Sequence, residues 1–149
     1  MSSRVESPGR VAGVDYGDVR IGVAITDTDR TIASPLENYT RRTLQQDAEW
    51  FRRLVAEQGV RLFVVGLPIH LDGLESQMSQ KARKFGEWLG QTTGVPVEFF
   101  DERFTSHEAE QALLAVDMTR KRRKRRLDML AAQIMLTAYL EGRGTRDEG

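Results

Sequence analysis

Three acidic residues stand where predicted elements begin or end, and together they could hold metal ions. Asp15 ends one apolar run, Glu102 follows another, and Asp128 opens the last predicted helix. Hard divalent cations such as Mg²⁺ and Mn²⁺ prefer oxygen ligands. Two such ions can activate a water and stabilise the leaving oxygen in a displacement at phosphorus. Paired carboxylates without metal would instead suit general acid–base chemistry on a sugar.

A basic run favours the metal chemistry. The segment RKRRKRR holds seven of the 22 Lys and Arg residues, which leaves 15 against 22 acidic residues in the rest of a chain of zero net charge. A block of this kind suits a polyanion partner, although a solvated loop is the alternative interpretation. We expect a phosphate-rich substrate, nucleic acid, to be bound by Arg120, Lys121, Arg122, Arg123, Lys124, Arg125 and Arg126.

The composition indicates a globular protein and excludes several classes of site. A chain of 149 residues that is 40% hydrophobic and 30% charged predicts one domain with a substantial core. The absence of cysteine excludes disulfides, thiolate metal ligands and a cysteine nucleophile. No apolar run is long enough to span a bilayer, and the first residues lack the apolar stretch of a secretory signal. We therefore expect a cytoplasmic protein with no membrane partner.

The apolar pattern predicts the elements that place the three acids. The strand over 11–14 is apolar throughout, as in a central strand, and a turn at Gly17 leads into a second strand that ends near Asp27. A third strand over 31–39 contains Pro35, which confines it to a sheet edge. The remaining predicted elements are a helix over 43–59 that begins at a Thr43–Gln46 capping box, a strand over 62–65, a helix from 78 to Gly94, a strand over 97–100, and helices over 105–116 and 127–141.

This order predicts an α/β fold with a five-stranded mixed sheet. Its first three strands are antiparallel, and right-handed crossovers place the last two parallel to the first, with helices on both faces. Asp15 and Glu102 then lie at the same sheet edge, and side-chain alternation lets only one of Glu102 and Asp101 face the site. We expect a domain over 10–141 between flexible tails at 1–9 and 142–149. In the last helix, the residues expected to face inward are Leu127, Leu130, Ala131, Ile134 and Ala138.

Four motifs in fixed order resemble those of the YqgF (RuvX-like) family. They are DYGDVRIGVAITD, the loop GLPIHLDG, FFDERFTSHEA, and the basic run that leads into LDMLAAQIML. The resemblance covers the chain from about Arg10 to Glu141. It implies an RNase H-like fold and a nuclease that matures the 5′ end of precursor 16S rRNA, or a Holliday junction resolvase. His70 is a departure, because the family often has Asn at that position of the loop.

The resemblance also implies roles for individual residues. Asp15 would bridge two metal ions, Glu102 would hold one, and Asp128 would hold the other. Arg103 would contact a phosphate or brace Glu102. The reaction would be endonucleolytic hydrolysis that leaves a 3′-hydroxyl and a 5′-phosphate.

Other interpretations of these features stay open. Asp15 could serve only the turn, Asp128 could stabilise a helix N-terminus, and Arg103 could form a surface ion pair. A junction resolvase would need two active sites and therefore a homodimer, whereas an RNA nuclease could be a monomer. A non-catalytic RNA-binding ribosome-assembly factor could share the fold. A kinase of the actin-like type is disfavoured, because such proteins use two of these domains around a cleft.

Overall fold

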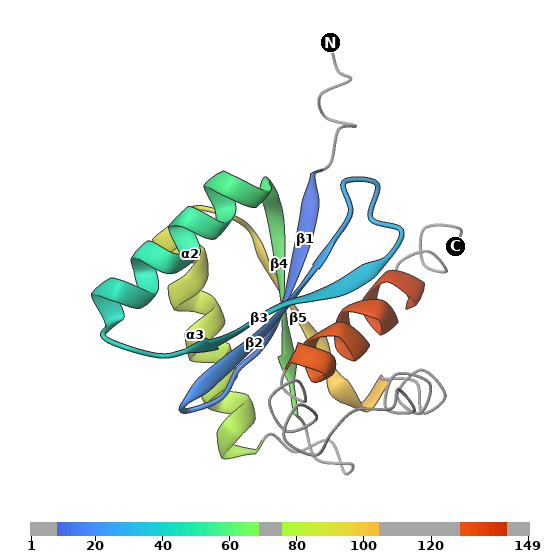
Figure 1. Ribbon diagram of the computed structural model, residues 1–149. Helices are drawn as coiled ribbons and strands as arrows, with labels where there is room; N and C mark the ends of the chain where they lie inside the picture. Colours follow the sequence, from blue (N-terminus) through green and yellow to red (C-terminus); the bar gives the residue numbers. More distant parts are fainter. Residues whose placement is uncertain (1–8, 69–75, 105–128, 143–149) are drawn as a thin grey trace, which may run out of the picture.

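A five-stranded sheet forms the centre of the protein, and helices cover both of its faces (Figure 1). The computed structural model describes residues 9–68, 76–104 and 129–142. The strand order is β3-β2-β1-β4-β5; β1, β2 and β3 pair antiparallel, and β4 and β5 run parallel to β1. The predicted mixed sheet is confirmed. The strands are β1 (Arg10–Asp15), β2 (Arg20–Thr26), β3 (Ala33–Thr40), β4 (Val60–Leu67) and β5 (Val97–Asp101).

β3 lies at the sheet edge, as Pro35 predicts. The pairing of β2 with β3 shifts at this point, because Val23 pairs with Glu37 whereas the next residue, Ala24, pairs with Pro35. An edge strand or a bulge is where a proline, which has no N–H to donate, disturbs a ladder least. The pairing between β2 and β3 is regular on either side of this point, but its register differs by one residue.

Two helices, α2 (Leu44–Gln58) and α3 (Gln77–Thr93), pack on one face of the sheet. The predicted capping box is present at the start of α2, where Thr43 accepts from the backbone N–H of Gln46 and the Gln46 side chain accepts from the Thr43 backbone. At the end of α2, Gly59 adopts the left-handed conformation, with φ of 67°, which costs glycine little. Fully buried side chains in this layer include Val14, Ile21, Val23, Phe51, Phe63, Val65 and Leu89.

A helix over residues 129–142 covers the opposite face of the sheet (Figure 1). It packs against the middle of β1 at Gly13, where a Cβ would lie 3.0 Å from the Cβ of Leu136 and 3.4 Å from the carbonyl oxygen of Ala132. A glycine at this position therefore lets the helix approach the sheet closely. Sheet residues Val11, Ala24, Leu62 and Val64 form a core with helix residues Ala132, Met135, Leu136 and Tyr139.

The predicted inner face of this helix is partly wrong. Leu130, Ile134 and Ala138 are buried as expected, but Ala131 is exposed. The residues that pack against the sheet form a neighbouring stripe, which the predicted spacing does not indicate. They are Ala132, Met135, Leu136 and Tyr139. The helix is therefore buried over a wider arc than a single stripe.

Several expectations concern residues outside the described ranges. These are Leu127, the helix over 105–116 and almost all of the two tails. Among the helices that the structure describes, none has both the length and the apolar character needed to cross a membrane.

Candidate active site

Asp15 stands at the carboxyl end of the central strand, on the face that the 129–142 helix covers. Val14 contributes to the core beneath α2 and α3, and Gly13 lies against Leu136, so alternation turns the next side chain, Asp15, toward the 129–142 helix. Asp15 is half-buried. Its direct partner on β2 is Gly22, which has no side chain to crowd it.

Glu102 reaches the same face from the opposite side of β4. It is the first residue of a 3₁₀ turn, η1 (Glu102–Phe104), directly after β5. Its carboxylate lies over Gly66 of β4, where a Cβ would collide with Oε2 and lie 3.1 Å from Cδ. Val14 pairs with Val65, so Asp15 and Gly66 are the next residues of strands about 5 Å apart. The structure thus brings the predicted pair Asp15 and Glu102 to one place.

The surroundings of Glu102 disfavour its charged form. Burial raises the pKa of its carboxyl above the usual value, and the neighbouring Asp101 carboxylate adds to the effect. A carboxylate in such a position is stabilised by a nearby cation. A cation bound at this site would therefore lower the pKa of Glu102 and stabilise its charged form.

Asp101 is engaged with Arg103. The Arg103 guanidinium donates from Nη2 to Oδ2 of Asp101 at 2.6 Å and from Nε at 2.9 Å, and its backbone N–H donates to Oδ1 at 2.9 Å. These bonds lower the pKa of Asp101. By alternation Asp101 shares the α3 side of the sheet with its partner Leu67. Of the two neighbouring acids, Glu102 is therefore the one on the face of Asp15.

The turn that joins β1 to β2 is held by contacts from two other elements. Arg41, after β3, donates from Nη1 to the Tyr16 hydroxyl at 2.7 Å and from its backbone N–H to the Val19 carbonyl at 2.9 Å. Its guanidinium carbon lies 5.1 Å from the centre of the Tyr16 ring. On α3, Lys81 Nζ lies 3.4 Å from Oδ1 of Asp18. The backbone at the end of β1 is therefore fixed from two directions.

The donor set at this edge suits a hard divalent cation, because it consists of carboxylate oxygens on one sheet face. Within the described ranges, no group of three acidic, His or Cys side chains could hold a metal on its own. Asp128, the third predicted ligand, lies outside those ranges, one residue before the first described residue of the helix over 129–142. His70 and the whole basic run from Arg120 to Arg126 lie outside them as well.

Two features of the site are not predicted from the sequence: the approach of Glu102 to Gly66 and the contact of Arg41 with Tyr16. Gly66 is the last residue but one of β4, and glycine inside a strand is a known signal of close approach by another group. The apolar pattern predicts a strand over 62–65 and assigns Gly66 no role at the site. Arg41 carried no local signal, because its partner Tyr16 is 25 residues away.

Comparison with known proteins identifies sequence relatives of the chain. The profile of the RuvX family, described as "Holliday junction resolvase", matches residues 9–142. A relative from Rhodopirellula baltica is 49% identical over 140 residues, which cover 94% of this chain and 81% of the relative. One from Caldanaerobacter subterraneus is 41% identical over 133 residues, covering 89% and 96% of the two chains. Both carry the name "Putative pre-16S rRNA nuclease".

Solved structures show the same architecture. Thermus thermophilus RuvC in complex with a Holliday junction substrate matches with a TM-score of 0.61 at 13% identity, over 92% of this chain and 96% of the other. The fowlpox virus Holliday junction resolvase matches with a TM-score of 0.52 at 12% identity, over 89% and 99%. At this identity the likeness concerns the fold alone, and it confirms the predicted RNase H-like arrangement. Together with the matching family profile and the sequence relatives, it shows that the chain belongs to the RuvX family.

Proposed function

We propose that this protein is a metal-dependent, cytoplasmic endonuclease that matures the 5′ end of precursor 16S rRNA. One observation carries the proposal: Glu102 folds back over Gly66 and so lies on the same face and at the same edge as Asp15. Gly66 has no side chain, and the Glu102 carboxylate occupies the space above it. A carboxylate at this position contributes little to apolar packing, but it can serve as a metal ligand. The names of the relatives supply the substrate.

Asp15, Glu102 and Asp128 would hold Mg²⁺ or Mn²⁺. Bound there, such ions would lower the pKa of water and stabilise charge on the leaving oxygen of a phosphodiester. Asp15 projects from the central strand, whose end is fixed by the contacts of Arg41 to Tyr16 and Val19, so its position is defined before any ligand binds. Arg103 follows Glu102 in the chain, and its guanidinium, which binds Asp101, would offer its remaining N–H donors to a substrate phosphate.

The proposal is tested by comparing cleavage by the parent, Asp15→Asn and Asp29→Asn. Asp29 makes a matched control, because it is an exposed acid in the turn between β2 and β3, at the other end of the sheet. With Mg²⁺ or Mn²⁺ and a precursor 16S rRNA fragment, we expect parent and Asp29→Asn to cut equally and Asp15→Asn to be inactive. Cleavage by Asp15→Asn at the parent rate would refute the proposed site.

A Holliday junction resolvase is the second candidate, favoured by the description of the family and by the likeness to RuvC. It requires two sites acting together on one junction, and hence a homodimer. Cleavage of a four-way DNA junction and of the rRNA fragment under matched conditions separates the two functions. Binding of RNA without metal-stimulated cleavage by either assay would instead indicate a non-catalytic assembly factor.

A further inference from the structure

Polar side chains continue the face of Asp15 across β2 and β3, on the side away from Arg103. Asp15 pairs with Gly22 on β2, and Gly22 pairs with Asn38 on β3. Two residues further along, Arg20 pairs with Thr40. These pairings arrange Asn38, Gly22, Asp15 and Gly66 in one row across the sheet, with Arg20 and Thr40 in the next row outward.

Side-chain alternation places both rows on the same face. Ile21 and its partner Tyr39 turn toward α2, where Ile21 joins the core and Tyr39 packs against Phe51. Arg20 and Thr40, one residue away on each strand, therefore turn to the opposite face, which is that of Asp15. From strand spacing, Arg20 is one strand across and two residues along from Asp15, roughly 8 Å between backbones.

The two outer residues are chemically suited to phosphate and open to solvent. Both Arg20 and Thr40 are exposed. A guanidinium can bind phosphate oxygens through two parallel N–H donors, and a threonine hydroxyl can add a third.

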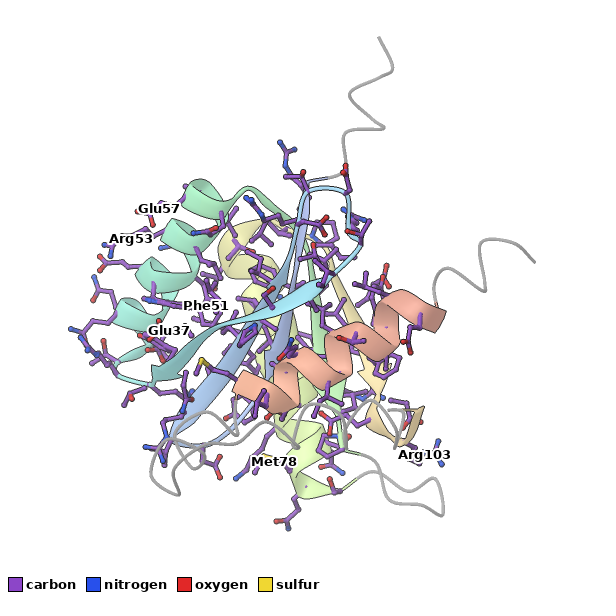
Figure 2. The ribbon with its side chains drawn as sticks, turned by 45° about the vertical axis from the view of Figure 1, so that its right-hand side comes forward. Glu37, Phe51, Arg53, Glu57, Met78 and Arg103 are labelled. Carbon is purple, nitrogen blue, oxygen red and sulfur yellow. The ribbon has the colours of Figure 1, made fainter. Side chains whose placement is uncertain are left out.

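We propose that Arg20 and Thr40 bind backbone phosphates of the nucleic acid on the β2–β3 side of the cleavage site. The inference rests on the proposed function and adds a binding surface separate from Arg103 and from the basic run. Arg103 lies beyond β5, at the other end of the strand order (Figure 2). A strand of nucleic acid crossing the carboxyl edge of the sheet would then be held on both sides of Asp15.

The test measures binding rather than cleavage, in the Asp15→Asn background so that the substrate stays intact. The variants are Arg20→Gln and Thr40→Val, with Arg53→Gln as the matched control. Arg53 is exposed on α2, on the far side of the molecule from Arg103 in Figure 2. The probes are a labelled RNA hairpin containing the 5′ flank of a 16S rRNA precursor and a four-way DNA junction, titrated at several salt concentrations.

We expect Arg20→Gln to weaken binding and to reduce the slope of log K against log salt by about 0.7–0.9, the effect of one lost phosphate contact. Thr40→Val should weaken binding with an unchanged slope, and Arg53→Gln should change neither. Equal slopes for Arg20→Gln and Arg53→Gln on both probes, or no binding to either probe, would overturn the inference. A parent that binds with these slopes but never cuts would refute the nuclease and leave this surface intact.

Discussion

At the scale of single residues, the site depends on Gly66 of β4, which has no side chain and so leaves room for the Glu102 carboxylate. Two neighbouring acids, Asp101 and Glu102, follow the last apolar run, and the sequence alone favours neither on physical grounds. The structure distinguishes them because Glu102 occupies the space above Gly66, while Asp101 binds Arg103 on the other side. The choice depends on a neighbouring strand more than thirty residues away, so no local pattern could reveal it.

Gly66→Ala should therefore impair the site without a large effect on the fold. The new Cβ would collide with the Glu102 carboxylate and force it off the face of Asp15. A displacement of about 1 Å in a catalytic group can cost roughly 100-fold in rate, so we expect kcat/KM for cleavage to fall by about that factor. Gly142→Ala is the matched control, because a Cβ there meets no atom within 4 Å. Equal rates for the two variants would show that Glu102 need not lie over β4.

At the scale of elements, the corner between β3 and α2 connects a buried carboxylate to the turn after Asp15. Asp47 is 1% exposed and accepts from the Tyr39 hydroxyl at 2.6 Å and from the Arg42 backbone N–H at 2.9 Å. Arg41 lies between this carboxylate and Tyr16, with its Nε 3.8 Å from Asp47. The capping box predicted the start of α2 correctly because a cap is local. The connection from α2 to β1 joins residues far apart in sequence and was not predictable.

The hydrogen bond of Tyr39 makes the stability of this corner sensitive to alkaline pH. Burial and the bond to Asp47 raise the pKa of Tyr39 from 10.0 to about 12. Because the folded-state pKa lies above the unfolded one, the neutral phenol stabilises the fold fully below pH 10, and this contribution is lost as the pH rises toward 12. Denaturant unfolding across this range should show the decline in the parent and in Tyr139→Phe. Tyr39→Phe should lack it, and a decline of the same size in that variant would assign the effect to another group.

At the scale of the whole molecule, the fold was more predictable than the contacts within it. Apolar runs, a proline at position 35 and helix caps indicate the elements, and the right-handed crossover rule orients β4 and β5. The helix over 129–142 shows the limit of this reasoning. Its stripe of Leu130, Ile134 and Ala138 is buried, yet the sheet is met by Met135, Leu136 and Tyr139. Which stripe meets the sheet depends on how the helix crosses it, and Gly13 on β1 determines part of that crossing.

Two acids on one face of the sheet also predict that divalent metal stabilises the entire fold. Like charges close together destabilise each other, and a cation bound only by the folded state stabilises it by about 2.7 kcal/mol at roughly 100 times Kd. For a chain of this size each kcal/mol raises Tm by about 2–4 °C. Thermal unfolding of the parent and of Asp29→Asn should therefore shift upward with Mg²⁺ or Mn²⁺ and return to its starting point with a chelator.

The Tm of Glu102→Gln should differ from that of the parent in its response to metal, both in the chelator and with the cation present. In the chelator its Tm should equal or exceed that of the parent, because a neutral amide is cheaper to bury beside Asp15 than a second carboxylate. With metal its Tm should barely rise, because a ligand is missing. A metal-dependent rise in Glu102→Gln as large as in Asp29→Asn would mean that the cation binds elsewhere on the molecule, and that the proximity of Asp15 and Glu102 serves another purpose.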